Sequence, residues 1–458
     1  MGKITQETLN KAWNDNFGDF RALIRIPSVY DEETITSTMP CGKAVNDALV
    51  FMHSLCEREG FKIKDYDGHA FSASYGEGER VDIVSHLDVV AVDSDWDDDP
   101  FSGTRKDGRV YGRGTQDMKS GAFITFLALK ILKDNGIVPL HEIRLVYGTD
   151  EERTMDDMRY YVEKEGLPAF AFSPDGRFPM AIGEKGALMW IVEGDFESRV
   201  QKLSIGIQPN VIPPFAEAEV SIAGNATGTD ATGTDAICTS EKFVTEGKAA
   251  HASRPEDGDS AGTKMFKLLY EKTGEDMWKR LYEAFSDPFG KGCGFDSMLP
   301  EDDGGIFAML TVNPGIVTFE RSNNSGDANM SEDCMGHFKA MIDCRYPMGV
   351  SSLDLTDKLA KLFPDFSVTL PYDDPPSMAD PQSEYVKLLK GAYKMTTGKA
   401  CEPFVSGGVS YSKVFGNCVT FGTVAEDSES LAHQRNESIS EDDCLKALEI
   451  YLKFIAAL

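Results

Sequence analysis

Short apolar segments alternate with helical segments at both ends of this 458-residue chain. Strand patterns occur at 81–84, 143–147, 169–172 and 418–422, and apolar residues recur at helical spacing in 6–25, 42–60, 118–135, 383–394 and 440–458. Because parallel strands need crossover connections, this alternation is typical of α/β domains. We therefore expect an α/β domain with a mixed, largely parallel sheet, built from both ends of the chain.

The middle of the chain follows a different pattern, in which apolar and polar residues alternate from about 186 to 375. Residues 187–192 and 218–222 are examples, and we interpret them as strands. Residues 225–235 are rich in Gly, Thr, Ala and Asp, which indicates a hairpin tip or a mobile loop. The simplest organisation is one domain formed by 1–185 and 376–458, interrupted by an inserted α+β domain at 186–375.

The chain is strongly acidic, with 46 Lys and Arg residues against 75 Asp and Glu residues and a formal net charge of −29. A negative field of this size repels phosphate backbones and anionic lipids, so neither nucleic acid nor a membrane is an expected partner. The nine cysteines are scattered without a CxxC pair, which favours reduced thiols. Since no apolar run approaches the length of a membrane span, we expect a cytoplasmic protein.

Acidic or imidazole side chains directly follow several of the predicted strands. His86 and Asp88 come after the strand at 81–84. Glu151, Glu152 and Asp175 come after the next two strands in the same way. The carboxyl ends of parallel strands lie at one edge of a sheet, where the sites of open α/β proteins assemble. We expect these side chains to gather there.

Three of the seven histidines, His86, His251 and His433, stand in polar turns rather than in apolar periods. Asp117 precedes the predicted helix at 118–135, where an N-cap would explain an aspartate equally well. Imidazole and carboxylate ligands together favour zinc, with manganese or cobalt as alternatives, over magnesium. Asp88 lies two residues after His86, so in an extended chain both side chains project to the same side and Asp88 is able to orient the imidazole. Five ligands and one spare carboxylate suit a hydrolase with two metal ions.

Six motifs carry these residues, in order, over nearly the whole chain. They are Ser-His-Leu-Asp-Val-Val (85–90), Gly-Arg-Gly-Thr-Gln-Asp-Met-Lys-Ser-Gly (112–121), Gly-Thr-Asp-Glu-Glu (148–152), Ser-Pro-Asp-Gly (173–176), Ala-Ala-His-Ala-Ser (249–253) and Ala-His-Gln-Arg-Asn-Glu (432–437). Together they resemble the M20 family of metallopeptidases, and within it the bacterial dipeptidases of the PepV type. The resemblance implies a catalytic domain with an inserted lid domain, and hydrolysis of dipeptides or short free-amino peptides at two divalent metal ions.

The resemblance also implies a role for each ligand. His86 and Asp175 would hold one zinc ion, and Glu152 and His433 the other. Asp117 would bridge the two ions.

Three further residues receive catalytic roles from the resemblance. Asp88 would orient His86. Glu151 would be the general base for a water bridged between the metals, and it would return the proton to the leaving amine. His251, from the lid, would stabilise the oxyanion together with zinc.

The substrate-binding residues implied by the resemblance are Asn210, near the oxyanion, and Arg345, for the terminal carboxylate of the substrate. Gly407 and Gly408 correspond to the family's substrate-binding loop. Ser406, Val409 and Ser410 depart from the glycine and threonine common there in related dipeptidases. The departure concerns side-chain preference rather than the reaction.

Asp175 also bears on the type of substrate. In the M20 family, peptidases that act on free amino termini tend to carry aspartate at this position, whereas carboxypeptidases and deacylases tend to carry glutamate.

The insertion resembles the dipeptidase lid that takes the place of a dimer partner, so we expect a monomer. The alternatives are an M20-type deacylase or desuccinylase acting on N-acyl amino acids, and a non-catalytic binding protein of the same fold. All five ligands and Glu151 are present, which argues against the second alternative.

Overall fold

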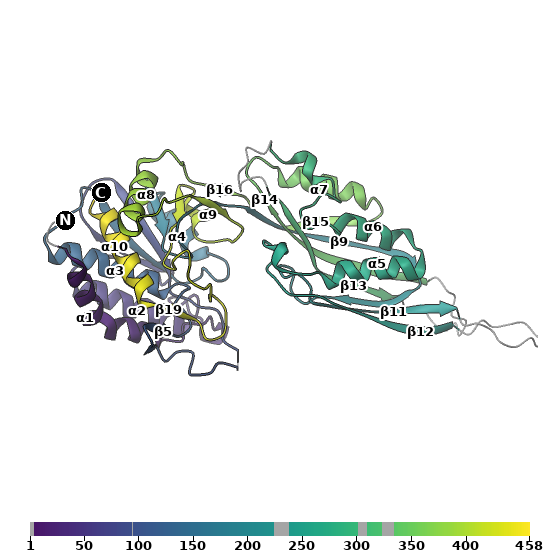
Figure 1. Ribbon diagram of the computed structural model, residues 1–458, viewed down its shortest axis with the longest axis horizontal. Coiled ribbons are helices and arrows are strands. Elements are labelled where there is room, and N and C mark those ends of the chain that lie inside the picture. Colours follow the sequence, from purple (N-terminus) through teal and green to yellow (C-terminus); the bar gives the residue numbers. More distant parts are fainter. Residues whose placement is uncertain (1–3, 94, 224–237, 301–308, 323–333) are drawn as a thin grey trace, which may run out of the picture. The chain divides into compact units, whose positions relative to one another are not determined.

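The computed structural model describes residues 4–93, 95–223, 238–300, 309–322 and 334–458, so the loop predicted at 225–235 lies outside the described residues. The chain forms two compact units (Figure 1). Unit 1 comprises Met1–Glu184 and Ser377–Leu458, and unit 2 comprises Lys185–Pro376. The roles of catalytic domain and lid stay predictions for these two units.

A mixed sheet of nine strands forms the centre of unit 1. The strands are β1 (Lys62–Tyr66), β2 (Ala70–Tyr75), β3 (Arg80–His86), β6 (Glu142–Gly148), β7 (Phe170–Ser173), β8 (Ala181–Glu184), β16 (Ser377–Met378), β17 (Phe404–Ser406) and β18 (Cys418–Thr420). Their order is β1-β2-β6-β3-β7-β18-β8-β16, with β17 beside β8. The central strands β6, β3, β7 and β18 are parallel, while β1, β2 and β16 pair antiparallel. The expected α/β fold with a mixed sheet is confirmed.

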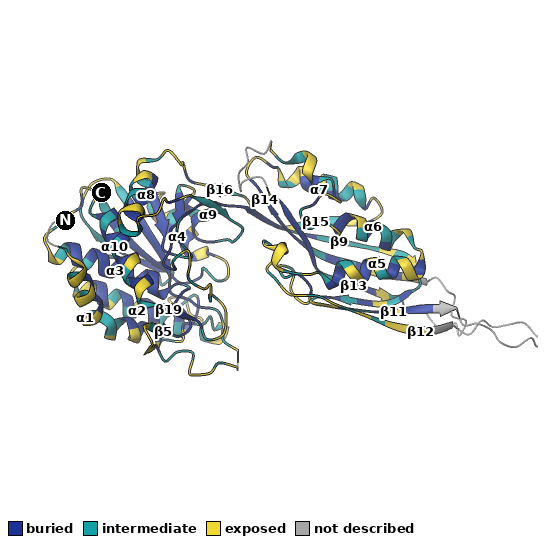
Figure 2. Cartoon of the chain, viewed as in Figure 1, coloured by how far each residue is buried: buried dark blue, intermediate teal, exposed yellow. Residues whose placement is uncertain are grey.

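Helices cover both faces of this sheet (Figure 1). The helices of unit 1 are α1 (Gln6–Ile24), α2 (Lys43–Arg58), α3 (Lys119–Asp134), α4 (Asp156–Glu165), α8 (Glu384–Thr397), α9 (Ser412–Phe415) and α10 (Glu441–Ile455). Helix α3 lies between the sheet and helices α1 and α10, and it is buried along most of its length because apolar residues surround it (Figure 2). Helices α4 and α9 pack on the opposite face, around Met158, Tyr161 and Phe415.

Ser440 and Gly136 mark ends of two helices of unit 1. Ser440 caps α10 through a hydrogen bond from the backbone N–H of Asp443, and Gly136 follows α3 with a φ of +67°. The prediction of Asp117 as a helix cap is wrong, because Met118 is the N-cap of α3 and no side chain caps it. The carboxylate of Asp117 is directed to two imidazoles instead.

A small three-stranded sheet joins two distant parts of unit 1. It consists of β4 (Thr104–Lys106), β5 (Arg109–Tyr111) and β19 (Ser438–Ser440), in the order β19-β5-β4. Strand β5 leads into the segment 112–117, and strand β19 follows the segment 433–437. The antiparallel pairing of β5 with β19 therefore places these two segments side by side.

Unit 2 is a seven-stranded antiparallel sheet with helices packed on it. The strands are β9 (Gly186–Ser198), β10 (Val200–Ile205), β11 (Phe215–Ala223), β12 (Cys238–Glu246), β13 (Thr311–Arg321), β14 (Cys334–Tyr346) and β15 (Ser367–Asp374), in the order β12-β11-β10-β13-β14-β9-β15. Helices α5 (Ala261–Thr273), α6 (Asp276–Phe285) and α7 (Ser352–Leu362) contribute Phe266, Trp278 and Leu359 to one core with the sheet. This is the α+β organisation expected for the insertion.

None of the helices in the described part of the chain has the length and apolar composition needed to span a membrane.

Candidate metal centre

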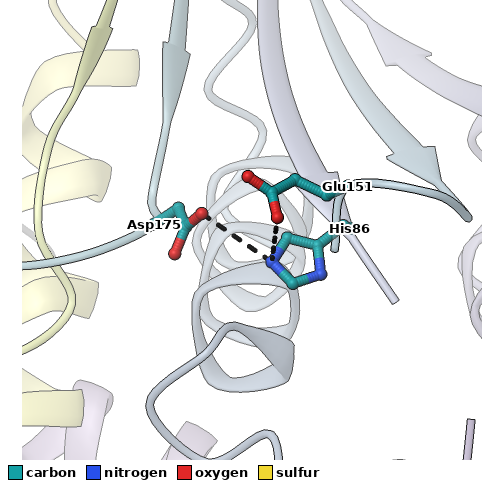
Figure 3. A group of neighbouring side chains, drawn as sticks. All are labelled: His86, Glu151 and Asp175. Atoms are coloured by element: carbon teal, nitrogen blue, oxygen red, sulfur yellow. Dashed lines mark ion pairs between the residues drawn. The ribbon is translucent and has the colours of Figure 1, made fainter. Parts of the chain in front are cut away.

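Four of the predicted site residues lie at the carboxyl edge of the central sheet. His86 is the last residue of β3, Glu151 and Glu152 follow β6, and Asp175 follows β7. Because these strands are adjacent and parallel, their ends meet. The Nε2 atom of His86 lies 4.0 Å from a carboxylate oxygen of Glu151 and 3.7 Å from one of Asp175 (Figure 3).

Asp117 lies between the two predicted histidine ligands. One carboxylate oxygen of Asp117 is 3.0 Å from Nε2 of His86, and the other is 3.0 Å from Nε2 of His433. The same nitrogen of His433 is 3.2 Å from the carboxylate of Glu152. The structure thus brings all five predicted ligands together, with the Asp117 carboxylate shared between two imidazoles.

The orientation of His86 is fixed by Asp88, although mainly through its backbone. Nδ1 of His86 lies 2.9 Å from the carbonyl oxygen of Asp88 and 3.5 Å from its carboxylate. A carbonyl only accepts, so Nδ1 carries the proton and Nε2 is the nitrogen available to a metal. The carboxylate of Asp88 instead accepts the backbone N–H groups of Glu151, at 3.4 Å, and Glu152, at 3.0 Å.

Burial and the neighbouring carboxylates raise the proton affinity of Glu151 and Glu152. Burial raises the pKa of Glu151 well above its usual range, and the charges of Asp175, Glu152 and Asp117 add to the effect against that of His86. Burial and the charge of Asp117 raise the pKa of Glu152 to about 7. The cluster therefore concentrates negative charge in a place that water reaches poorly.

Both imidazoles respond to the same excess of negative charge. Burial disfavours the charged form of His86, but its hydrogen bonds to Asp117, Asp175 and Asp88 raise its pKa well above the usual value. Hydrogen bonds to Asp117 and Glu152 raise the pKa of His433 to about 11. A site that draws protons onto imidazoles in this way also suits divalent cations, which displace those protons when they bind.

Among the residues that the structure describes, two groups of side chains have ligand atoms close enough to share one ion. The first is His86, Glu151 and Asp175, and the second is His86, Asp117 and Glu152. Imidazole nitrogens and carboxylate oxygens in this proportion suit zinc and other borderline divalent ions. Glu151 belongs to the first group, so geometry alone does not separate it from the ligands.

The predicted residues of unit 2 form a group of their own. The carbonyl of Asn210 accepts the backbone N–H of Ala252 at 2.9 Å, and Val211 forms a bridge with His251. The side-chain amide of Asn313 on β13 donates to the carbonyl oxygens on both sides of Asn210, each at 3.0 Å. Asn210 and His251 therefore lie side by side.

Arg345 belongs to the same region of unit 2. Asp343 lies opposite Asn313 in the pairing of β14 with β13. Its carboxylate accepts from Nε of Arg345 at 3.0 Å and from Nη2 at 2.9 Å, which fixes the buried guanidinium.

Gly407 and Gly408 follow β17 in unit 1, and the N–H of Gly408 donates to the Ser406 hydroxyl at 3.0 Å. Two residues further on, Ser410 donates its N–H and its hydroxyl to the buried carboxylate of Glu184. Ser410, one of the residues at which the chain departs from the family pattern, is thus hydrogen-bonded to the last residue of β8.

Several residues that support the centre had no role assigned from sequence. Glu437, at the end of the last motif, is fully buried against the segment 112–117. Asp157 is also fully buried, where it accepts the N–H of Thr149 at 2.6 Å and the hydroxyl of Tyr411. Nothing in the local sequence separates these carboxylates from exposed ones on helices and loops, because their partners come from distant segments.

A cluster of imidazoles and carboxylates at the edge of an α/β sheet, with one carboxylate shared, is the type of ligand set that metal-dependent hydrolases use. Residues 83–457 match peptidase family M20/M25/M40, and the chain belongs to this family of metallopeptidases. Divalent metal ions and peptide substrates are general features of the family.

Relatives extend the match over almost the whole chain. A Staphylococcus epidermidis protein named "Putative dipeptidase" is 30% identical over 476 residues, which covers 97% of each chain. The dipeptidase Dug1p of Saccharomyces cerevisiae has a similar structure, with a TM-score of 0.59, 14% identity and coverage of 99% and 98%. So does the M20 metallo-carboxypeptidase Sso-CP2 of Sulfolobus solfataricus, with a TM-score of 0.56, 18% identity and coverage of 96% and 98%. Since these two enzymes differ in substrate, the fold alone does not define the substrate.

Proposed function

We propose that this enzyme hydrolyses dipeptides, or short peptides with a free amino terminus, at two divalent metal ions, with zinc preferred and cobalt or manganese as alternatives. The observation that carries the proposal is the carboxylate of Asp117, whose two oxygens each lie 3.0 Å from a different imidazole. A carboxylate shared in this way would be able to serve both ions of a two-metal hydrolase.

The ligands divide around Asp117 into two sets. His86 and Asp175 would hold one ion, and Glu152 and His433 the other. When bound, such ions polarise the peptide carbonyl and lower the pKa of water. Asp88 contributes by holding His86 through its carbonyl and by holding the turn of Glu151 and Glu152 through its carboxylate.

Glu151 is assigned as the general base. Its burial among other carboxylates raises its pKa, which makes it a better proton acceptor near neutral pH. It would take the proton of the attacking water and transfer it to the amine that leaves. Its neighbour Glu152 contacts His433 and is assigned as a ligand.

His251 of unit 2 is assigned to the oxyanion. The backbone N–H of Ser253 donates to Nδ1 of His251 at 3.2 Å, so Nδ1 is the acceptor and the neutral ring carries its proton on Nε2. An Nε2–H group is the donor that an oxyanion needs. Asn210, beside His251, is assigned to the same oxyanion.

We expect His251→Ala to lower kcat by about 10²–10³-fold, the usual effect of losing one oxyanion donor. KM and metal content should change little, because the oxyanion exists only near the transition state. Steady-state kinetics combined with metal analysis measures both. Ser253→Ala loses the hydroxyl that lies 2.7 Å from Nδ1 but keeps the backbone N–H and the imidazole, so it should retain most activity. Loss of metal from the His251 variant would instead make His251 a ligand.

Arg345 is assigned to the terminal carboxylate of the substrate. We expect Arg345→Ala to raise KM for dipeptides more than it lowers kcat, because the contact is present in the ground state as well as the transition state. Comparing each dipeptide with its C-terminal amide provides the control. Wild-type enzyme should prefer the free carboxylate, and the variant should lose that preference. An unchanged preference would remove Arg345 from substrate binding.

The substrate class rests on Asp175 and on the name of the relative from S. epidermidis. The short side chain of Asp175 leaves room for the substrate's ammonium group and is able to pair with it. The decisive experiment assays a panel of dipeptides and their N-acetyl forms with zinc-loaded enzyme. Hydrolysis of free dipeptides only would support the proposal, and preference for the N-acetyl forms would favour a deacylase. Absence of turnover with every substrate would favour a binding protein.

The proposal also covers the oligomeric state and the cellular location. We expect a monomer, because the inserted unit takes the place of a dimer partner in the resemblance described above. The nine cysteines, scattered without a CxxC pair, favour reduced thiols and a cytoplasmic location. Sedimentation of the purified full-length chain tests the first expectation.

A further inference from the structure

We infer that Glu437 is a positioning residue for the second metal site, which is formed by Glu152, His433 and the shared Asp117. The inference rests on the proposed function, because it concerns ligands assigned there. Glu437 itself contacts none of the reacting groups. It would act by fixing the segment that carries Asp117 against the segment that carries His433.

The carboxylate of Glu437 is fully buried and accepts four hydrogen bonds from the segment 112–117. One oxygen accepts the backbone N–H of Gln116 at 2.7 Å and that of Asp117 at 3.2 Å. The other oxygen accepts the N–H of Gly114 at 3.2 Å and Nη1 of Arg113 at 2.7 Å. The segment thus wraps around the carboxylate with its backbone donors facing inward.

Side chains of the same segment hold the chain around His433. The guanidinium of Arg113 lies 3.3 Å from the carbonyl oxygen of Gln434 and 3.5 Å from that of His433. The side chain of Gln116 accepts the N–H of Leu431 at 2.8 Å. His433 has a φ of +62°, a conformation that non-glycine residues adopt only when their surroundings support it.

Only a carboxylate fits this position. All four partners of Glu437 are donors, two on each oxygen, so the amide of a glutamine would point its NH₂ group at two donors in either orientation. Buried N–H groups of the segment would then lose their acceptor, and the segment would shift. Asp117 would move with it because its own N–H is one of the four donors.

The first metal site depends on other supports. His86 is the last residue of β3 and Asp175 follows β7, so the central sheet positions both of them. A purely structural role of Glu437 predicts a general loss of stability. A positioning role predicts in addition that the second ion is weakened more than the first. The ratio of the two affinities separates the two roles.

The test titrates zinc into metal-free full-length protein by calorimetry and determines both affinities. For Glu437→Gln we expect the second affinity to fall by about 10–100-fold, the usual cost of removing an outer support of a ligand. The first affinity should fall much less, because that site shares Asp117 but keeps His86 and Asp175 on the central sheet. Arg113→Lys is the second variant, because it keeps a positive charge beside Glu437 but loses the fork that holds His433. It should shift the same affinity in the same direction by a smaller factor.

The matched control is Glu275→Gln in unit 2. Glu275 also serves several donors, namely the N–H of Arg199 at 2.8 Å, the Ser198 hydroxyl at 2.6 Å and the Trp278 indole at 2.8 Å. Its replacement should leave both zinc affinities as in the wild type. Equal affinities in wild type and in both site variants, or equal weakening of both ions, would overturn the inference. Failure of the wild type to bind two zinc ions would overturn the proposed function instead.

Discussion

Glu151→Gln should lower kcat by about 10²–10⁴-fold, the range typical of a lost general base, while two metal ions stay bound. The amide preserves the shape of the side chain but takes up no proton at neutral pH. Because Glu151 lies 4.0 Å from Nε2 of His86, among groups that could share an ion, this variant distinguishes a base from a ligand. Single-turnover kinetics and metal analysis of the same preparation give both quantities.

Glu152→Gln is the matched control, since the two glutamates are adjacent and their side chains are only 10% and 11% exposed. Glu152 contacts His433 at 3.2 Å, so its replacement should weaken metal binding and lower activity as a consequence. The opposite pattern, in which the Glu151 variant loses metal and the Glu152 variant keeps it, would reverse the two roles.

A stability measurement on the metal-free protein gives an independent check. The folded-state pKa of Glu151 is raised, so ionisation of this group disfavours the metal-free fold at neutral pH. The Glu151→Gln variant should therefore unfold at a temperature no lower than that of the metal-free wild type. A clearly lower melting temperature would indicate that the amide disturbs the centre, and the loss of kcat would then have a second cause.

Removal of the metal ions should abolish hydrolysis, and zinc, cobalt or manganese should restore it. The carboxylates of Asp117, Glu151 and Asp175 all face Nε2 of His86. In the proposed chemistry, only the metal ions would polarise the attacking water strongly enough for it to react. The measurement is activity against metal content, determined by mass spectrometry after dialysis with a chelator. Full turnover in protein that contains far less than one ion per chain would contradict the proposal.

Metal removal should also lower the melting temperature. A ligand that binds only the folded state stabilises it by about 2.7 kcal/mol at a hundredfold excess over Kd. Burial and, after it, neighbouring carboxylates raise the pKa values of Glu151 and Glu152, and bound cations would offset both effects. Added magnesium serves as the control, because it binds weakly to sites with imidazole ligands and should restore neither stability nor activity.

Much of the fold of unit 1 could be predicted from the sequence. The helices and strands expected near its two ends agree with α1, α2, α3, α8 and α10 and with β3, β6, β7 and β18 to within a few residues. These elements have a clear apolar period, which is a local property of the chain. The rule that parallel strands meet at one edge was then enough to bring His86, Glu151 and Asp175 together.

The sequence was a poorer guide where a residue had two local explanations. Asp117 stood where a helix cap is common, yet its carboxylate faces His86 and His433. Asp88 had the spacing to orient His86 with its carboxylate, but its carbonyl oxygen is the nearer partner of the ring. In both cases the choice was made by groups from other segments, which local spacing does not describe.

The sequence by itself determined the elements, the sheet edge and the residue types gathered there, because periodicity and strand direction are encoded locally. Only the tertiary structure decided how the segments join. The pairing of β5 with β19 brings Asp117 to His433, and the carboxylate of Glu437 holds their segments together. In unit 2, Asn313 and Asp343 bring Asn210, His251 and Arg345 into one region. These contacts join residues far apart along the chain, and a buried carboxylate or amide is recognisable as a support only when the donors packed around it are known.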